Sequence, residues 1–374
     1  MIRLWLLKLR ALARWQQAAL LAGLLIILTV GYIKYFTLYR YLTDKEQSMV
    51  NELLQNAQTR CIGVYLIDLP MELNPKGGML FKFNGLHGPM LESKIQYKAP
   101  FEQFIQRREL ELKGTKPVDA KDGEYLKRVY LSHDGMTGKV FERMESISMP
   151  DVARVLEGYK WDNDITFKIE MKADDGRASR YDEDRKVYVH SFDYNIPQKL
   201  DELTALFKRL HARNDIMIPN KPGLCILQGV LDGSPVEEYI LGFSYAHQNI
   251  SGLSIRFDTI NFGADSYSLL DQDERAITRG KSKTVYKGRR TANGLPIEEW
   301  IVSGDLFSEN KGSQFFLAIY EKESSIKKPK FTIRMSYRIP NDIKKQQVLT
   351  EAELITFWKE ITSTIRLREN AFEQ

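Results

Sequence analysis

Two stretches of the chain, one central and one C-terminal, carry the same order of apolar and polar positions. Each has an apolar run, then Tyr-x-Ile-Pro at residues 194–197 or 337–340, then an amphipathic pattern that ends in a basic tip. Apolar residues three and four positions apart share one face of a helix, so each stretch predicts a helix packed by one side. The predicted faces are Leu200, Leu203, Leu206, Phe207 and Leu210 in the first helix, and Leu354, Phe357, Trp358, Ile361 and Ile365 in the second.

Strand patterns precede both helices. A Cys-bearing apolar run at residues 61–70 predicts the first strand of one half, and a similar run at 223–231 opens the other. In residues 165–192, apolar and polar residues alternate on either side of Asp174-Asp175-Gly176, which predicts a hairpin with a charged tip. Several short strands with turn signals follow in the second half.

The repeated order predicts a duplicated chain. Residues 154–164 also align without gaps on residues 284–294, although a match this degenerate could arise by chance. The predicted fold class is α+β, with two similar domains that each have an antiparallel sheet and a packed helix. The expected domains cover residues 61–214 and 224–374, and the proline-containing stretch 215–223 is the expected linker.

The N-terminus has a different character. Residues 18–33 are uncharged and mostly apolar, with basic residues before them and tyrosines after them. This pattern predicts a transmembrane signal anchor within residues 1–42, with the N-terminus in the cytoplasm and the rest exported to the periplasm of a Gram-negative cell. A cleaved secretory signal is the alternative. A capping box at Thr43 and Glu46 predicts a short juxtamembrane helix within residues 43–60.

Composition and motifs give no sign of catalysis. The 43% apolar and 28% charged residues are ordinary for a folded protein, and the net charge of +5 comes largely from the N-terminal region. There is no Gly-x-Ser-x-Gly elbow, and Gly280-Lys281-Ser282 lacks the earlier glycine of a phosphate loop. The five histidines stand singly, so we expect no metal, no cofactor and no nucleic-acid partner.

The two cysteines, Cys61 and Cys225, both belong to the exported part. A disulfide between them fits an oxidising compartment, and two buried free thiols fit their apolar surroundings equally well.

The apolar runs at residues 61–70 and 223–231 and the stretches 158–175 and 288–300 together resemble the type VI secretion lipase-immunity proteins, which are the cognate partners of an antibacterial phospholipase effector. Val64 departs from this resemblance, because a basic residue is expected there. The resemblance implies two periplasmic α+β domains without activity of their own. It also implies that both domains grip the phospholipase like a claw and block its active site or hold its lid. A membrane-anchored periplasmic adaptor or structural envelope protein is the alternative, and an enzyme with an unrecognised site is a third hypothesis.

Loops held by the sheets are the expected partner surface. The candidates lie in the charged tip at residues 174–185 and in the loop at 232–238, although plain solvation also explains these charges. The candidate residues are Asp174, Asp175, Arg177, Arg180, Asp182, Glu183, Asp232 and Glu237. The other expected partners are the membrane, through the N-terminal helix, and a single effector molecule in a 1:1 complex with a monomer.

Overall fold

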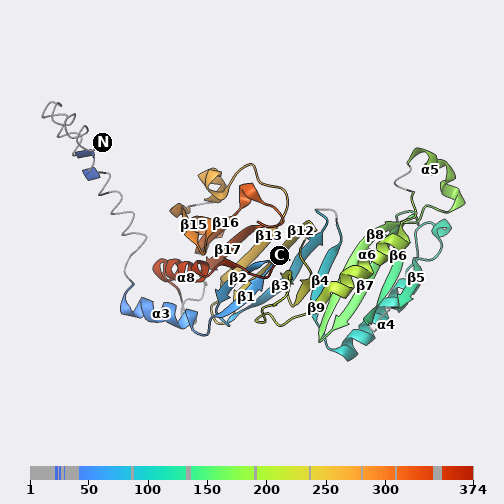
Figure 1. The fold of residues 1–374 in the computed structure, drawn as a ribbon, viewed down its shortest axis with the longest axis horizontal. Helices are drawn as coiled ribbons and strands as arrows, with labels where there is room; N and C mark the ends of the chain where they lie inside the picture. Colours follow the sequence, from blue (N-terminus) through green and yellow to red (C-terminus); the bar gives the residue numbers. More distant parts are fainter. Residues whose placement is uncertain are drawn as a thin grey trace.

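The computed structural model describes residues 22–23, 25–26, 29, 42–85, 88–131, 136–188, 192–235, 237–278, 281–307, 310–339 and 348–373 (Figure 1). The predicted signal anchor therefore lies outside the described residues, apart from a few helical positions between 22 and 29. None of the helices in the described ranges has the length and apolar character required to cross a bilayer.

Apart from α3 and α5, which occur in the first half, the two halves of the described chain contain equivalent elements in the same order. In each half, a hairpin is followed by two strands, a helix, four strands, a second helix and a final short strand. The first half contains α3 (Asp44–Leu54), β1 (Gln58–Ile62), β2 (Tyr65–Leu69), β3 (Leu73–Phe83), β4 (Met90–Ile95), α4 (Lys98–Gly114), β5 (Leu126–Leu131), β6 (Thr137–Met144), β7 (Ala153–Asp162), β8 (Ile165–Asp174), α5 (Asp182–Val187), α6 (Ile196–Arg209) and β9 (Leu210–Ala212). The second half contains β10 (Gly223–Ile226), β11 (Gly229–Asp232), β12 (Tyr239–His247), β13 (Leu253–Ile260), α7 (Glu274–Ile277), β14 (Lys283–Ala292), β15 (Leu295–Phe307), β16 (Asn310–Ile319), β17 (Lys330–Arg338), α8 (Glu351–Ser363) and β18 (Arg366–Leu367).

One large sheet runs through both halves. Its strand order is β14-β15-β16-β17-β13-β12-β3-β4-β8-β7-β6-β5, and every neighbouring pair is antiparallel. The order reads the same outward from the central pair β12–β3 in either direction, so the halves are related by an approximate twofold axis. The α+β class and the antiparallel sheet of each half are as predicted. The fusion of the two sheets along β3 and β12 was not predicted from the sequence (Figure 1).

The halves also exchange their short strands. The last strand of the first half, β9, pairs with β11 of the second half, and the last strand of the second half, β18, pairs with β2 of the first. Between these small sheets, Cys61 is joined to Cys225 by a disulfide, and the backbones of Gly63 and Cys225 exchange two hydrogen bonds. The bridge therefore links equivalent strands, β1 and β10, close to the axis.

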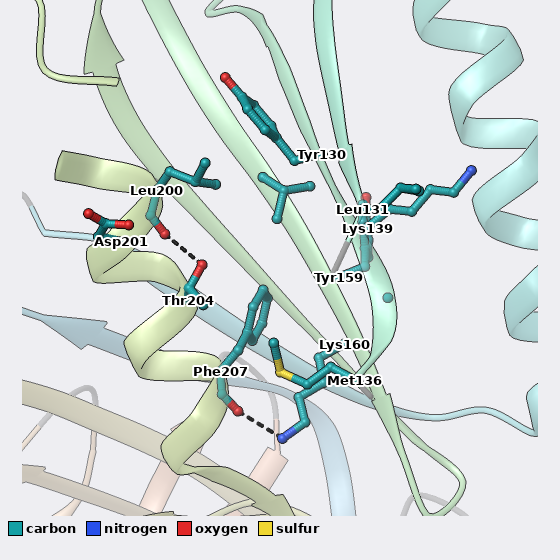
Figure 2. Close-up of a pocket in the computed structure, with 12 residues that line it drawn as sticks. Tyr130, Leu131, Met136, Lys139, Tyr159, Lys160, Leu200, Asp201, Thr204 and Phe207 are labelled. Atoms are coloured by element: carbon teal, nitrogen blue, oxygen red, sulfur yellow. Dashed lines mark hydrogen bonds between the residues drawn. The ribbon is translucent and has the colours of Figure 1, made fainter. Parts of the chain in front are cut away.

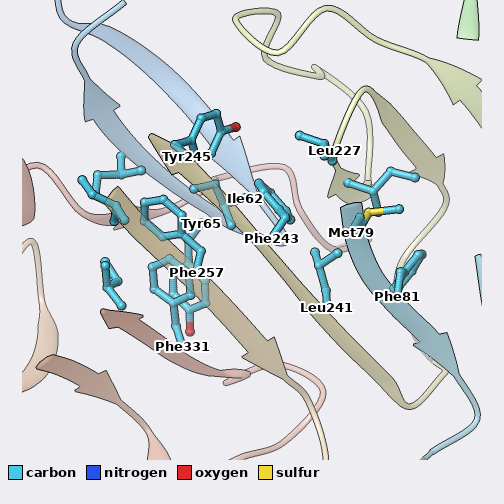
Figure 3. Packing of buried hydrophobic residues seen from close by; sticks show 14 of the residues in the cluster. Ile62, Tyr65, Met79, Phe81, Leu227, Leu241, Phe243, Tyr245, Phe257 and Phe331 are labelled. Carbon is cyan, nitrogen blue, oxygen red and sulfur yellow. The ribbon is translucent and has the colours of Figure 1, made fainter. Parts of the chain in front are cut away.

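The largest hydrophobic core lies on one face of the sheet and combines residues of both halves (Figure 3). Tyr65 of β2 stacks on Phe331 of β17 with 4.6 Å between ring centroids, and its hydroxyl donates to the carbonyl of Pro329 at 2.6 Å. The helices α6 and α8 cover the same face, each through the predicted apolar positions, since Leu203, Phe207, Trp358 and Ile361 are all buried. Neither half could bury this surface alone.

Two buried arginines lie next to the short strands that cross between the halves. Arg213, after β9, donates to the carbonyls of Cys61, Ile226 and Gly229 and to three carbonyls of the following turn. Arg368, after β18, donates to the carbonyls of Pro219, Lys221, Gly223 and Asn370. These two arginines belong to the two basic tips of the repeated pattern, and both are buried and bonded to carbonyls instead of facing solvent.

Helix α3 does not stand free as a stalk. Its capping box at Thr43 and Glu46 forms as predicted, and α3 packs against α8 (Figure 1). Val50 and Leu53 are buried, and Glu46 accepts a hydrogen bond from the Thr350 hydroxyl at 3.1 Å. The chain before residue 43 therefore leaves from the α8 side of the second half.

Three local predictions were wrong. Residues 61–70 and 223–231 are hairpins and not single strands, because Gly63 and Gln228 adopt positive φ angles of 62° and 62° that turn the chain. The described residues 165–188 form no hairpin, because the acidic and basic residues after Tyr181 form α5 instead of a returning strand. The gap-free match of 154–164 with 284–294 aligns β7 with β14, which occupy different places in the sheet order.

A second, smaller core lies under α4 and contains one fully buried carboxylate. Glu157 accepts hydrogen bonds from Arg108 at 2.6 Å, from Arg143 at 2.5 Å and from the Tyr159 hydroxyl at 2.7 Å. Burial opposes ionisation of Glu157, but the bonds from Arg108, Tyr159 and Arg143 outweigh it and lower the pKa to about 2.

This carboxylate predicts a loss of stability in acid. A group whose pKa is lower in the folded state contributes its full stabilisation above its unfolded pKa, here 4.5, and loses it as the pH falls toward about 2. We expect the melting temperature of the parent to fall across this window, and that of Glu157→Gln to start lower near pH 7 and change less. Thermal melts at several pH values test this. Melting temperatures that fall equally with decreasing pH in the two proteins would contradict it.

Candidate functional site

The predicted charged tip is a compact, internally bonded segment. Asp175 accepts two hydrogen bonds from Arg177, at 2.7 and 2.9 Å, and these hold the pKa of Asp175 below its usual value. Arg177 lies over the ring of Tyr194 at 3.6 Å, and the Asp174 backbone and side chain bond to Asn195. The flanks of the tip therefore close on each other next to the start of α6.

Beyond this base, the tip is tied to neighbouring loops. Arg180 pairs with both Asp122 and Asp151 and lies over the ring of Tyr181 at 4.7 Å. Asp182 pairs with Arg185 and Glu183 pairs with Lys186, both within α5, and α5 has no buried residue. In Figure 1, α5 stands away from the sheet at the end of the first half. Of the six predicted residues here, Arg177, Asp182 and Glu183 have the most exposed side chains.

The second predicted loop lies where the halves meet. Arg209, at the end of α6, donates to the carbonyl of Asp232 at 2.7 Å and pairs with Glu237. The backbone of Glu238 accepts a hydrogen bond from Asn84 of the first half at 2.7 Å. Asp232 and Glu237 therefore serve contacts between the halves.

The two predicted regions do not form one site. The tip closes at the first turn of α6, and the loop is bonded to its last turn. A helix of this length separates its ends by about 20 Å. A partner that touched both would have to extend along the whole of α6.

The sequence did not reveal the largest candidate surface, an uncovered sheet face that spans both halves. Register pairs place Phe141, Glu157, Glu170, Met90, Lys82, Ile240 and Ile260 in one row on the same side of the sheet. Helix α4 covers the row at Phe141 and Glu157, through the core that contains Phe101 and Ile105. From Glu170 to Ile260 the same side chains are only half-buried.

The other end of this face is covered in the same way. A parallel row passes from Ser244 through Arg256, Arg334 and Phe316 to Trp300. Trp300 is buried with Leu269 beneath the short helical segment at residues 268–277, which includes α7. We call the central region the open face. It consists of the outward residues Leu80, Lys82, Met90, Glu170, Ile240, Arg256, Asp258, Thr332 and Arg334.

The open face is charged and already partly paired. Arg256 and Asp258 bond to each other at 2.8 Å, and Arg143 and Lys168 both bond to Glu170. Arg334 is exposed and lies 5.3 Å from the centre of the Phe316 ring, with no carboxylate partner in the described ranges. A partner surface that presents carboxylates could therefore pair with Arg334 in the middle of the open face.

A notch of about 740 Å³ opens at the junction of the halves, where β3 and β4 share a single register pair, Lys82 with Met90. Its charged side chains are paired internally, as in Lys172 with Glu145 at 2.5 Å and Lys199 with Glu202 at 2.8 Å. These pairs form a polar, water-accessible lining, which fits contact with a protein loop better than enclosure of an apolar ligand. In the described part of the chain, no group of three His, Cys, Asp or Glu residues could hold a metal ion.

Comparison with known proteins places both halves in one family of models. Residues 58–213 match the model of the Tle cognate immunity protein 4 N-terminal domain, and residues 217–370 match that of its C-terminal domain. The chain is similar to the apo structure of the immunity protein TplEi of the type VI secretion system from Pseudomonas aeruginosa. The TM-score is 0.64 and the identity 20%, over 85% of this chain and 99% of that one.

Two further solved structures have the same fold. A Tle4–Tli4 complex matches with a TM-score of 0.64 and 19% identity, over 85% of this chain and 99% of that one. TplEi complexed with the "L" peptide matches with a TM-score of 0.57 and 19% identity, over 84% and 99%. No curated protein sequence matches the chain.

Proposed function

Because this chain belongs to the Tle cognate immunity protein 4 family, we propose that it binds and inhibits a cognate phospholipase delivered by a type VI secretion system. As an immunity protein it is not an enzyme, and it acts through complementary surface. The observation that carries the proposal is the tandem match of both domain models over most of the chain.

The proposed mode of action is a rigid two-sided grip. The open face supplies a floor that crosses both halves, and α4 and the segment 268–277 supply a raised edge at each end. The two halves are fused through β3 and β12 and through the disulfide, so the grip would be preformed and would cost little ordering on binding. Held in this way, the phospholipase would have its active site covered or its lid fixed.

The proposed location is the periplasm, with the N-terminal segment as an inner-membrane anchor. The apolar stretch at residues 18–33 and the oxidised cysteine pair support this location. Tethering would hold the chain near the lipids that the effector attacks and raise its effective concentration there. A fusion of the C-terminus to alkaline phosphatase should be active, and an inactive fusion would contradict export.

The proposal is tested by protection. Cells that produce a candidate type VI phospholipase from the same genome, directed to the periplasm, should survive when the chain is co-expressed and should lyse without it. The two proteins should also co-purify. Lysis despite a folded, co-expressed chain, together with no co-purification, would instead favour an envelope adaptor without a toxin partner.

A charge reversal on the open face separates the proposed grip from other binding modes. Arg334→Glu places a carboxylate in the middle of the floor, and we expect the Kd for the effector to rise about tenfold or more through charge mismatch. Lys45→Glu, on the exposed side of α3, is the matched control and should leave the Kd unchanged. Equal affinity of both variants would remove the open face from the interface.

A further inference from the structure

A small apolar hollow lies on the opposite side of the sheet from the open face, between α6 and strands β5 to β7 (Figure 2). Its volume is about 180 Å³, and its apolar lining comes from Met136, Val140, Leu200 and Phe207. Asp201 and Thr204 of α6 and Tyr130 of β5 complete the wall (Figure 2). Beside Tyr130, the side chain of Leu131 is 68% exposed.

The hollow lies beside the middle turns of α6, and the last turns of this helix pack closely on β7. A Cβ atom on Gly158 would lie 2.8 Å from the ring of Phe207 and 3.0 Å from Leu203, so the glycine allows the last turns of α6 to touch β7. Lys160 fixes this end by donating to the carbonyls of Phe207 and Leu210. Nearer the start of α6, Leu200 and Thr204 face β5 and β6 across the hollow.

The second half has a tryptophan at the helix position equivalent to Leu203. Trp358 precedes Arg368 by the same interval as Leu203 precedes Arg213, and both helices occupy the same position in their halves. Trp358 is fully buried, lies 5.5 Å from the Phe315 ring and donates to Glu299 at 3.0 Å. The duplication thus gives one half a packed tryptophan and the other a smaller buried leucine at the same helix position.

Most polar groups around the hollow are bonded within the described chain, but one carboxylate is not. Lys139 pairs with Glu109 at 2.8 Å, the Tyr130 hydroxyl donates to Glu142 at 2.7 Å, and the Thr204 hydroxyl donates to a backbone carbonyl. Asp201 is exposed and has no ion-pair partner in the described ranges. The edge of the hollow therefore presents an unpaired carboxylate next to an apolar cavity.

We propose that this hollow is a second contact site for the effector and receives one apolar side chain, of leucine or phenylalanine size, that stands beside a lysine or arginine. The volume is below the roughly 300 Å³ of sites for drug-sized ligands and is comparable to a cavity of about 150 Å³ that holds benzene. Asp201 would pair with the lysine or arginine that stands beside this apolar side chain of the effector, since a cation fits the unpaired carboxylate. An apolar anchor in a pocket with a charged rim is the usual composition of an interface hot spot. The proposal rests on the proposed function, because it takes the effector as the partner.

Binding of the full chain to the purified effector tests the hollow. Thr204→Phe fills the volume from α6 and Asp201→Lys reverses the charge, and we expect each to raise the Kd about tenfold or more. Ala205→Phe adds the same bulk to the same helix at an exposed position outside the hollow, and it should bind as the parent does. Melting temperatures of all variants should stay close to that of the parent, and the conservative Asp201→Asn should lose less affinity than Asp201→Lys.

The outcomes separate the two proposals. If Thr204→Phe and Asp201→Lys are folded and bind the effector as tightly as the parent does, the proposed contact at the hollow is wrong and the immunity function stays intact. A folded parent that does not bind the effector overturns both. Loss of binding in Ala205→Phe as well would mean that the whole outer surface of α6 is the contact, which overturns the single-anchor proposal.

Discussion

Replacing Cys61 and Cys225 by serine is expected to lower the free energy of unfolding by about 4 kcal/mol. The bridge closes a loop between residues 164 positions apart, and the chain-entropy relation gives about 5 kcal/mol for a loop of this length, with native disulfides typically worth about 2–5. Most of the effect should come from the unfolded state, which regains the freedom to separate the halves. Urea titrations of parent and double variant measure it as a shift of the midpoint.

Reduction provides the matched control for this prediction. Both cysteines are fully buried in the folded chain, so a reductant should act when the chain opens. The parent in excess reductant should then titrate like the double-serine variant, and the variant should be insensitive to reductant. A parent whose midpoint is the same with and without reductant would contradict a stabilising bridge.

Replacing Arg213 by alanine is expected to cost about 3–5 kcal/mol of stability, the usual range for breaking up a buried charged network. Its side chain is 4% exposed and is bonded almost wholly to carbonyls, with the carboxylate of Asp215 3.8 Å away. Burial lowers the pKa of Arg213, but the carbonyl bonds compensate the retained charge. Alanine would leave several buried carbonyls from both halves without donors, which is the larger penalty.

The equivalent arginine and a surface arginine serve as comparisons. Arg368→Ala should cost a similar amount, because Arg368 holds the residues before β10 in the same way. Arg107→Ala, on the exposed side of α4, should change stability by less than about 0.5 kcal/mol. Chemical denaturation of the three variants measures these differences, and equal stabilities for Arg213→Ala and Arg107→Ala would show that the buried bonds of Arg213 are dispensable.

Local signals predicted α3, α6 and α8, but α4, α5 and α7 were not predicted. The apolar faces and capping boxes of the predicted helices depend on neighbouring residues, so Thr350 with Glu353 and the buried Trp358 could be found by spacing alone. The same is true of the α+β class, since alternation and helical periodicity are local patterns.

The sequence could not reveal how the halves combine. The pairing of β9 with β11 and of β18 with β2 joins residues far apart in the chain, and their own hydrophobic patterns fit either partner. The sequence did not show that Arg213 and Arg368 of the basic tips are buried, because an arginine that donates to carbonyls has the same local context as one in water. The open face escaped notice for a related reason: alternation in β13 and β17 shows which residues point outward but not that no helix covers them.

The exchanged strands determine when the molecule can be completed. The hairpin β1–β2 lies near the beginning of the described chain, yet its outer neighbour, β18, is the last strand in the described ranges. The edge of β2 therefore stays unpaired until the C-terminal residues are present, and a chain shortened by its final turn and strand would leave both this edge and the carbonyls held by Arg368 unclosed. Such late closure would suit the proposed export, in which the polypeptide stays extended until it has passed through a translocation channel.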